Sequence, residues 1–178
     1  STFSYPRQMM LGAINDNSLI YEMGADIARQ LKRLGVHVNF APVIDINSNP
    51  QNPVINTRAF GENREQTVEK GLAYMAGMQD NGVLACAKHF PGHGDTDADS
   101  HYTLPLVNHS KQRLDSIELY PFRKLIEKGV SGVMVSHLNI PALEKMQDLA
   151  ASLSHGIVQK LLVDTMGFNG LIYTDALN

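Results

Sequence analysis

The chain has 178 residues, of which 43% are hydrophobic and 19% are charged, a composition typical of a folded domain and not of a disordered or fibrous chain. The formal net charge is -3 and the Lys and Arg residues are scattered, which argues against a nucleic-acid partner. No apolar run approaches the roughly 20 residues that a membrane-spanning helix needs, so no membrane partner is expected. Cys86 is the only cysteine, which excludes an intrachain disulfide.

Four stretches show the spacing of apolar residues that is typical of amphipathic helices. They lie between positions 20 and 34, 68 and 78, 114 and 126, and 157 and 162. Candidate N-caps precede three of them, at Asn17-Ser18, Ser110 and Ser154, because these side chains can accept hydrogen bonds from the free N–H groups of a first turn. Pro121 is expected to bend the third helix.

A glycine and then a short apolar run follow each predicted helix. Gly35, Gly82 and Gly129 are evenly spaced and each precedes a valine, while Gly167 and Gly170 precede the fourth run. The runs at 36–41, 83–87, 130–135 and 171–174 show little alternation of polar and apolar residues, which favours strands covered on both faces. Regular alternation of helix and strand predicts an α/β fold with a parallel sheet.

Polar residues follow each predicted strand, at Asp45, Lys88-His89, Ser136-His137 and Asp175. An active site that draws on the carboxyl ends of several strands favours a TIM (β/α)8 barrel over a doubly wound sheet, which concentrates its site at one switch point. A complete barrel needs about 250 residues. Residues 1–178 are therefore predicted to form part of one barrel domain, with about four βα units present and with N- and C-terminal strands missing.

The segment from Lys88 to His101 is the richest in polar chemistry, with three histidines and three aspartates after Lys88 and around two glycines. Three interpretations fit it: a polar surface loop, a metal site that uses His89, His93 and the following acidic residues, or an acid–base dyad formed by Asp99 and His101. Pro91 and the glycines argue against the helix on which a His-x₃-His pair binds metal well. Asp175, on its local sequence alone, could also be a helix cap.

Several motifs together resemble glycoside hydrolase family 3, and in particular its bacterial β-N-acetylglucosaminidase branch. The residues that carry this resemblance are Lys88-His-Phe-Pro-Gly-His-Gly94, Asp99-Ser-His101, Phe40-Ala-Pro-Val-Ile-Asp45, Arg58-Ala-Phe-Gly61, Met134-Val-Ser-His137 and Gly167-Phe-Asn-Gly-Leu-Ile-Tyr-Thr-Asp175. They occur in the expected order and extend over nearly the whole chain. The resemblance implies that residues 1–178 are part of the N-terminal catalytic barrel domain of this family.

The resemblance also implies a role for individual residues. Asp175 is expected to be the nucleophile of a retaining reaction, and His101 the general acid and base, with Asp99 as its partner. A sugar is expected to contact Arg58, Lys88, His89, His93 and His137. Asp45 is expected to hold Arg58 or Lys88 in place.

The implied activity is removal of terminal β-linked N-acetylglucosamine from an amino-sugar glycoside or a peptidoglycan fragment, without metal or cofactor. A β-glucosidase or a phosphorylase of the same family, a metal-dependent hydrolase and an inactive carbohydrate-binding fragment are the alternatives. The family usually has an upstream aspartate segment that holds the sugar and that is not in these 178 residues, so the chain alone could be inactive. The resemblance leaves open the oligomeric state and whether the protein acts in the bacterial cytoplasm or periplasm.

Overall fold

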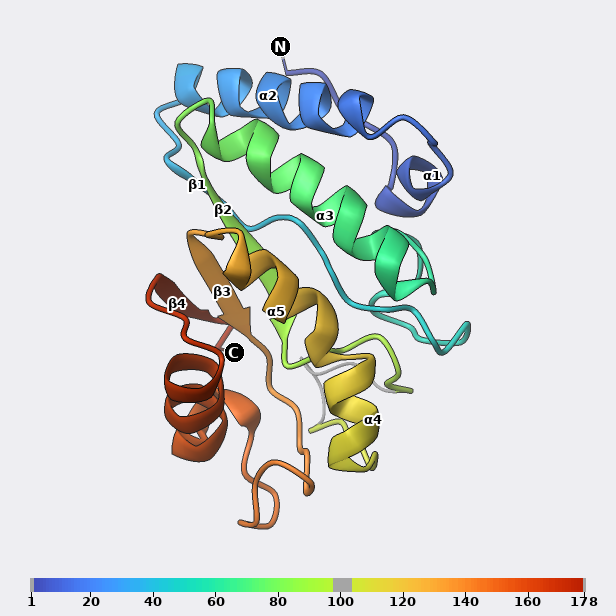
Figure 1. Ribbon diagram of the computed structural model, residues 1–178, viewed down its shortest axis with the longest axis vertical. Helices are drawn as coiled ribbons and strands as arrows, with labels where there is room; N and C mark the ends of the chain where they lie inside the picture. Colours follow the sequence, from blue (N-terminus) through green and yellow to red (C-terminus); the bar gives the residue numbers. More distant parts are fainter. Residues whose placement is uncertain (1, 98–103, 178) are drawn as a thin grey trace.

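The computed structural model describes residues 2–97 and 104–177, and it has a parallel four-stranded sheet in the order β1-β2-β3-β4 (Figure 1). The strands are β1 Val38–Asn39, β2 Leu84–Phe90, β3 Gly132–Val135 and β4 Leu171–Thr174. The helices that precede them are α2 Asn17–Arg33, α3 Arg64–Gln79, α4 Lys111–Ser116, α5 Leu119–Glu127 and the π-helix η3 Gly156–Thr165. Three short helical segments complete the described structure: α1 Gln8–Gly12, η1 Asn56–Arg58 and η2 Ala151–Leu153. The prediction of part of a barrel is confirmed, because the strands and helices form an open half-barrel.

The sheet curls so that side chains from its two outer strands meet. Phe40, which follows β1, packs edge to face against Tyr173 of β4, with ring centroids 5.0 Å apart. Neighbouring strands are about 4.8 Å apart, so three strand spacings separate these residues along the sheet. Gly132 of β3 lies beneath the Tyr173 ring, and a Cβ atom there would come within 2.9 Å of that ring. The ring contact therefore marks the concave face of the half-barrel.

The hydrophobic core lies between the convex side of the sheet and the helices. Fully buried side chains of this core include Ile20 of α2, Met78 of α3, Phe122 of α5 and Leu162 of η3. These positions belong to the four predicted amphipathic stretches, which explains why each helix packs on the sheet with its apolar face. In the part of the chain that the structure describes, no helix is long and apolar enough to cross a membrane.

The helix boundaries differ in detail from the predictions. Asp16, and not Asn17-Ser18, caps α2, because its carboxylate accepts a hydrogen bond from the Ser18 N–H at 2.9 Å. Ser110 caps α4 as predicted, with a hydrogen bond from the Arg113 N–H at 3.2 Å. The Ser154 hydroxyl likewise accepts from the N–H of Ile157 in the first turn of η3.

The third predicted helix is broken in two and is not simply bent. Helix α4 ends at Ser116 and α5 begins at Leu119, with Pro121 in the first turn of α5. Proline is tolerated in a first turn, where its missing N–H would have no helical partner, but it disrupts the interior of a continuous helix. The proline therefore ends one helix and begins the next.

Helices α2 and α3 approach each other closely because glycines lie at their contact. A Cβ atom at Gly77 of α3 would overlap the backbone of α2 at Tyr21 and Ala25. Gly71 lies in the same helix, but a Cβ atom there would meet only side-chain atoms, with Ile44 Cγ2 at 3.0 Å. The backbone of α2 cannot move aside without shifting the helix, whereas the Ile44 side chain can adjust.

We expect Gly77→Ala to lower the free energy of unfolding by about 1–3 kcal/mol, since an overpacked contact outweighs the better helix propensity of alanine. Gly71→Ala is the matched control and should stay within about 1 kcal/mol of the parent protein. Denaturant titration followed by circular dichroism measures both variants. Equal effects of the two substitutions would contradict the close contact between α2 and α3.

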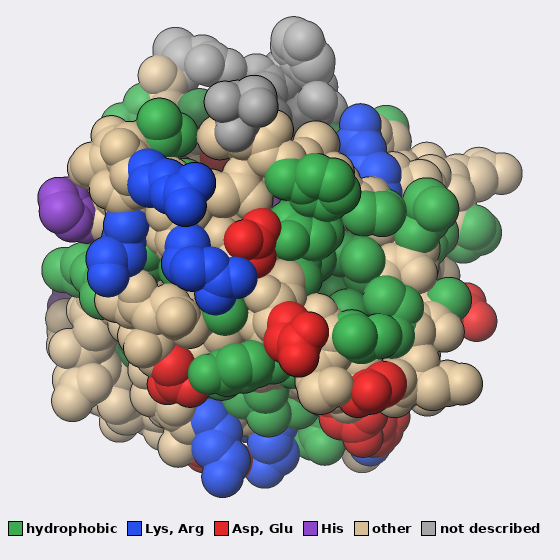
Figure 2. Space-filling model, turned by 90° about the horizontal axis from the view of Figure 1, so that it is seen from above, with side chains coloured by type: hydrophobic (Ala, Val, Ile, Leu, Met, Phe, Trp, Pro, Cys, Tyr) green, Lys and Arg blue, Asp and Glu red, His purple; other side chains and the backbone are tan. Residues whose placement is uncertain are grey.

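The outer face of α2 carries a group of basic side chains (Figure 2). Arg29, Lys32 and Arg33 line a shallow hollow together with Asp80 and Gly82. This hollow lies at the C-terminal end of α2 and just before β2, which is the side of the sheet away from the carboxyl ends of the strands. Cations at the end of a helix stabilise its negative pole, so the cluster has a structural explanation.

Candidate active site

Backbone hydrogen bonds bring the polar residues that follow the strands to the same edge of the sheet. The Ile44 N–H bonds to the Lys88 carbonyl, the Ser136 N–H to the Phe90 carbonyl, and the Asp175 N–H to the Val135 carbonyl, each at 2.9 Å. These bonds align the ends of consecutive strands. Side chains from four strand ends therefore surround one region, as the sequence predicts.

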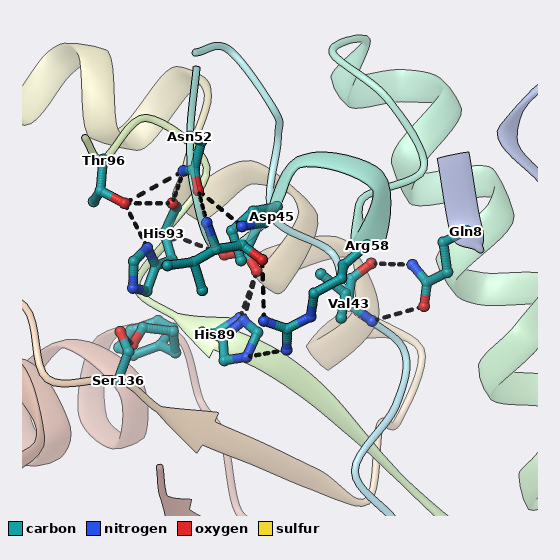
Figure 3. A network of polar contacts seen from close by, with 12 residues as sticks. Gln8, Val43, Asp45, Asn52, Arg58, His89, His93, Thr96 and Ser136 are labelled. Atoms are coloured by element: carbon teal, nitrogen blue, oxygen red, sulfur yellow. Dashed lines mark hydrogen bonds and ion pairs between the residues drawn. The ribbon is translucent and has the colours of Figure 1, made fainter. Parts of the chain in front are cut away.

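Asp45 lies at the centre of a buried network (Figure 3). The residue is 1% exposed. One carboxylate oxygen accepts hydrogen bonds from His89 Nδ1 at 2.7 Å and from the His89 backbone N–H at 3.1 Å, and the other accepts from the His93 backbone N–H at 2.7 Å. Burial by itself raises the pKa of Asp45, but the interactions with His89 and His93 outweigh burial and hold the pKa below its ordinary value. Asp45 is therefore a carboxylate that joins the segment after β1 to the end of β2 and to the loop that follows it.

Arg58 meets this network from the short helix η1. One of its guanidinium nitrogens, Nη2, lies 3.2 Å from His89 Nε2, and the other, Nη1, donates to the Val54 carbonyl at 3.2 Å. Asp45 was expected to hold Arg58 or Lys88. Its hydrogen bonds go to the two histidines; among the described residues its link to Arg58 runs through His89, and it acts on Lys88 electrostatically.

Lys88 is half-buried at the end of β2, close to both Arg58 and Asp175. Burial lowers the pKa of Lys88 and the positive charge of Arg58 lowers it further, while the negative charge of Asp175 acts in the opposite direction; the net shift is downward. Asp175 also acts electrostatically on His93. Asp175, which directly follows β4, therefore shares one electrostatic environment with Lys88 of β2 and Arg58 of η1.

His93 is completely buried in the loop after β2. Its Nδ1 lies 2.6 Å from the Thr96 hydroxyl, and its carbonyl accepts a hydrogen bond from the Asn52 amide at 2.8 Å. Burial is the main cause of a lowered His93 pKa. His93 is therefore held as a neutral side chain near neutral pH.

Thr96 and Asn52 support this loop, although the sequence analysis did not identify them. The Asn52 side chain also accepts hydrogen bonds from the Val54 and Ile55 N–H groups, in a turn that begins at Asn52-Pro53. An asparagine before a proline is a typical turn signal. That signal could have found Asn52, whereas no local pattern identifies Thr96.

His137 lies next to the segment that contains Asp175. Its Nε2 is 3.0 Å from the Ala176 carbonyl, and its Nδ1 is 2.7 Å from the Ser152 hydroxyl. A carbonyl oxygen only accepts hydrogen bonds, so Nε2 carries a proton, and in the neutral ring Nδ1 accepts from Ser152. His137 therefore connects the end of β3 to the residue after Asp175.

The predicted dyad of Asp99 and His101 lies outside the described residues. On one side of that segment Asp95 bonds to His109 Nε2 at 2.5 Å. Arg113 lies 4.0 Å from Asp95 and forms an ion pair at 3.1 Å with Glu118, a buried residue whose pKa is raised by burial. The sequence analysis missed this cluster, because its members come from segments far apart in the chain.

The described residues contain no group of three or more His, Cys, Asp or Glu side chains arranged to hold a metal ion. The ring nitrogens of His89 contact Asp45 and Arg58, and His93 Nδ1 contacts Thr96. These nitrogens, which the metal interpretation would use as ligands, therefore contact protein groups. Asp99 and His101 again lie outside this observation.

Three known proteins illustrate what the chain is similar to. A β-N-acetylglucosaminidase of glycoside hydrolase family 3 from Paenibacillus sp. str. FPU-7 matches 99% of this chain and 33% of its own at 45% identity, with a TM-score of 0.96. The β-glucoside phosphorylase BglX, solved with bound 2FGlc, matches 98% of this chain and 33% of its own at 31% identity, with a TM-score of 0.94. Beta-hexosaminidase A from Pseudoalteromonas piscicida is 40% identical over 167 residues, which are 88% of this chain and 28% of that protein.

The chain thus spans about a third or less of these proteins. Residues 2–178 also match the family described as Glycosyl hydrolase family 3 N terminal domain. This match covers nearly all of the sequence, and it agrees with the curled parallel sheet and with the motifs at the strand ends. The chain belongs to glycosyl hydrolase family 3.

Proposed function

We propose that the chain supplies part of the active site of a retaining exo-glycosidase that removes terminal β-linked N-acetylglucosamine. The observation that carries this proposal is the position of Asp175 directly after β4, within electrostatic reach of Lys88 and His93. A carboxylate among hydrogen-bond donors suits attack on a sugar whose hydroxyl groups those donors bind. The names of the similar β-hexosaminidase and β-N-acetylglucosaminidase support an amino-sugar substrate.

The proposed reaction has two steps. The Asp175 carboxylate attacks the anomeric carbon as the bond to the leaving-group oxygen breaks, and the His101 imidazolium gives its proton to that oxygen. A water molecule then attacks the anomeric carbon of the glycosyl-enzyme and gives its proton to His101, which releases Asp175. Asp99 would stabilise the charged form of His101. Arg58 and Lys88 would hold the sugar, and His137 would support the Asp175 segment. His89, whose ring nitrogens contact Asp45 and Arg58, and the completely buried His93 would position these donors and would not touch the sugar themselves.

Covalent labelling tests the nucleophile directly. The intact natural protein, treated with a 5-fluoro N-acetylglucosamine derivative that traps the glycosyl-enzyme, should carry one added sugar on the peptide that contains Asp175. The fluorine slows both steps, but a good leaving group lets the first proceed. Mass spectrometry of the digested protein locates the label. A label on another residue would refute the assignment of Asp175.

A phosphorylase is the second candidate, and the similarity to a β-glucoside phosphorylase favours it. In that reaction inorganic phosphate replaces water in the second step, and a neutral histidine repels an anion less than a carboxylate does. The two functions differ in their products. Reaction in phosphate buffer gives a sugar 1-phosphate if the protein is a phosphorylase and free sugar if it is a hydrolase.

A further inference from the structure

The protonation of His89 can be read from its two partners. Asp45 is a carboxylate that accepts from Nδ1 at 2.7 Å, and Arg58 Nη2 lies 3.2 Å from Nε2. A guanidinium is always a donor, so Nε2 must present a lone pair. A doubly protonated ring would place an N–H group against the N–H of Arg58. Only the neutral form with its proton on Nδ1 makes both contacts favourable.

Asp45 is the residue that selects this form. It is buried, and its two carboxylate oxygens accept hydrogen bonds from His89 and from the backbone N–H group of His93. A neutral histidine places its proton on the nitrogen that has the stronger acceptor. Here the carboxylate lies at Nδ1, which leaves Nε2 to accept from Arg58 and to direct the guanidinium (Figure 3).

We propose that Asp45 is a positioning residue that acts through His89 on Arg58, and so sets the direction of one sugar-binding donor. The role in sugar binding rests on the proposed function, whereas the assignment of the His89 proton to Nδ1 does not. Asp45 also bonds to the backbone N–H groups of His89 and His93, so a purely structural role in holding the loop is the competing explanation. The experiments must separate these two roles.

The first experiment determines which ring nitrogens of His89 carry a proton, by nitrogen NMR of protein whose histidines are labelled with ¹⁵N. Near neutral pH His89 should have its proton on Nδ1, and His137 should have the opposite form as an internal reference, because its Nε2 contacts the Ala176 carbonyl. In Asp45→Asn the signal of His89 should shift toward the form protonated on Nε2, while that of His137 stays unchanged. Glu118→Gln, which alters another buried side chain, should leave both histidines as they are.

The second experiment measures kcat/KM on an aryl N-acetylglucosaminide. Asp45→Asn should lower kcat/KM by about 10- to 100-fold, by analogy with the loss when the partner that orients a metal-ligating histidine is removed. If Asp45 acts through Arg58, adding Asp45→Asn to Arg58→Ala should change kcat/KM by no more than about twofold. A residue that only holds the loop would give losses that multiply.

These outcomes are decisive even if Asp45→Asn does not fold. His89 protonated on Nε2, or on both nitrogens, in the unaltered protein would overturn the proposal without any variant. Multiplying losses in the double variant would also overturn it. Absence of turnover by the intact natural protein would instead refute the proposed function, and the NMR result would still decide the protonation state of His89.

Discussion

Asp175→Ala should lower kcat for an aryl N-acetylglucosaminide by roughly 10³- to 10⁶-fold, because the alanine side chain cannot form the glycosyl-enzyme. The fold should be retained, since Asp175 is only partly buried and the bond from its backbone N–H to the Val135 carbonyl does not need the carboxylate. Steady-state kinetics and thermal unfolding of the intact protein measure the two effects separately.

Asp164→Ala is a suitable control for this substitution. Asp164 is an exposed aspartate near the end of η3, where it accepts a hydrogen bond from Gln159. Its loss should leave kcat within about twofold of the parent, since surface substitutions far from a site have small effects. An Asp175→Ala variant that keeps a tenth or more of the parent activity would argue against a nucleophilic Asp175.

His101→Ala should affect substrates according to their leaving groups. A poor leaving group needs a proton as the bond breaks, so we expect about a 10²- to 10⁴-fold loss in the first step. An activated aryl group leaves without help, and its first step should change little. A series of aryl N-acetylglucosaminides with leaving groups of graded acidity measures this difference.

The control for His101 is His109→Ala. His109 bonds to Asp95 beside the same segment, so its loss should disturb the loop without removing the proposed acid. The resulting change in rate should be similar for every leaving group in the series. Equal losses on poor and activated substrates in His101→Ala would contradict its role as the acid.

The order of the helices and strands could be predicted from the sequence, because both depend on local patterns. The apolar positions of α2 and α3 repeat at the helical period, and the glycines after the helices mark where strands begin. The ends of elements were less predictable. Asp16 and Asn17 are both good caps, and only the position of the backbone shows that Asp16 accepts the bond from Ser18.

The break between α4 and α5 shows a second limit. Pro121 signalled an irregularity, but a proline in a helical pattern is compatible with either a bend or a new first turn. Tertiary packing decides between them, since Phe122 and Leu125 of α5 must both reach the core. The sequence could not predict the π-helical form of η3 either, because its apolar spacing fits an ordinary helix.

In the candidate site, too, local sequence patterns predict some features and tertiary packing decides others. Residues beside a strand end, such as Lys88 and Asp175, could be identified because their place in the chain determines their place in a parallel sheet. Partners from distant segments could not. The contact between Asp45 and His93 joins positions 48 residues apart, and the one between Asn52 and His93 joins positions 41 apart. Such pairs depend on how the loops fold over one another.

The curled sheet has a consequence for how this polypeptide behaves in solution. Within residues 2–97 and 104–177 no strand pairs with the outer side of β1 or β4. Leu171 and Ile172 of β4 are 49% and 40% exposed. Free peptide groups beside exposed apolar side chains are a template on which another strand can add. Self-association of these 178 residues would therefore begin at the free margins of the sheet.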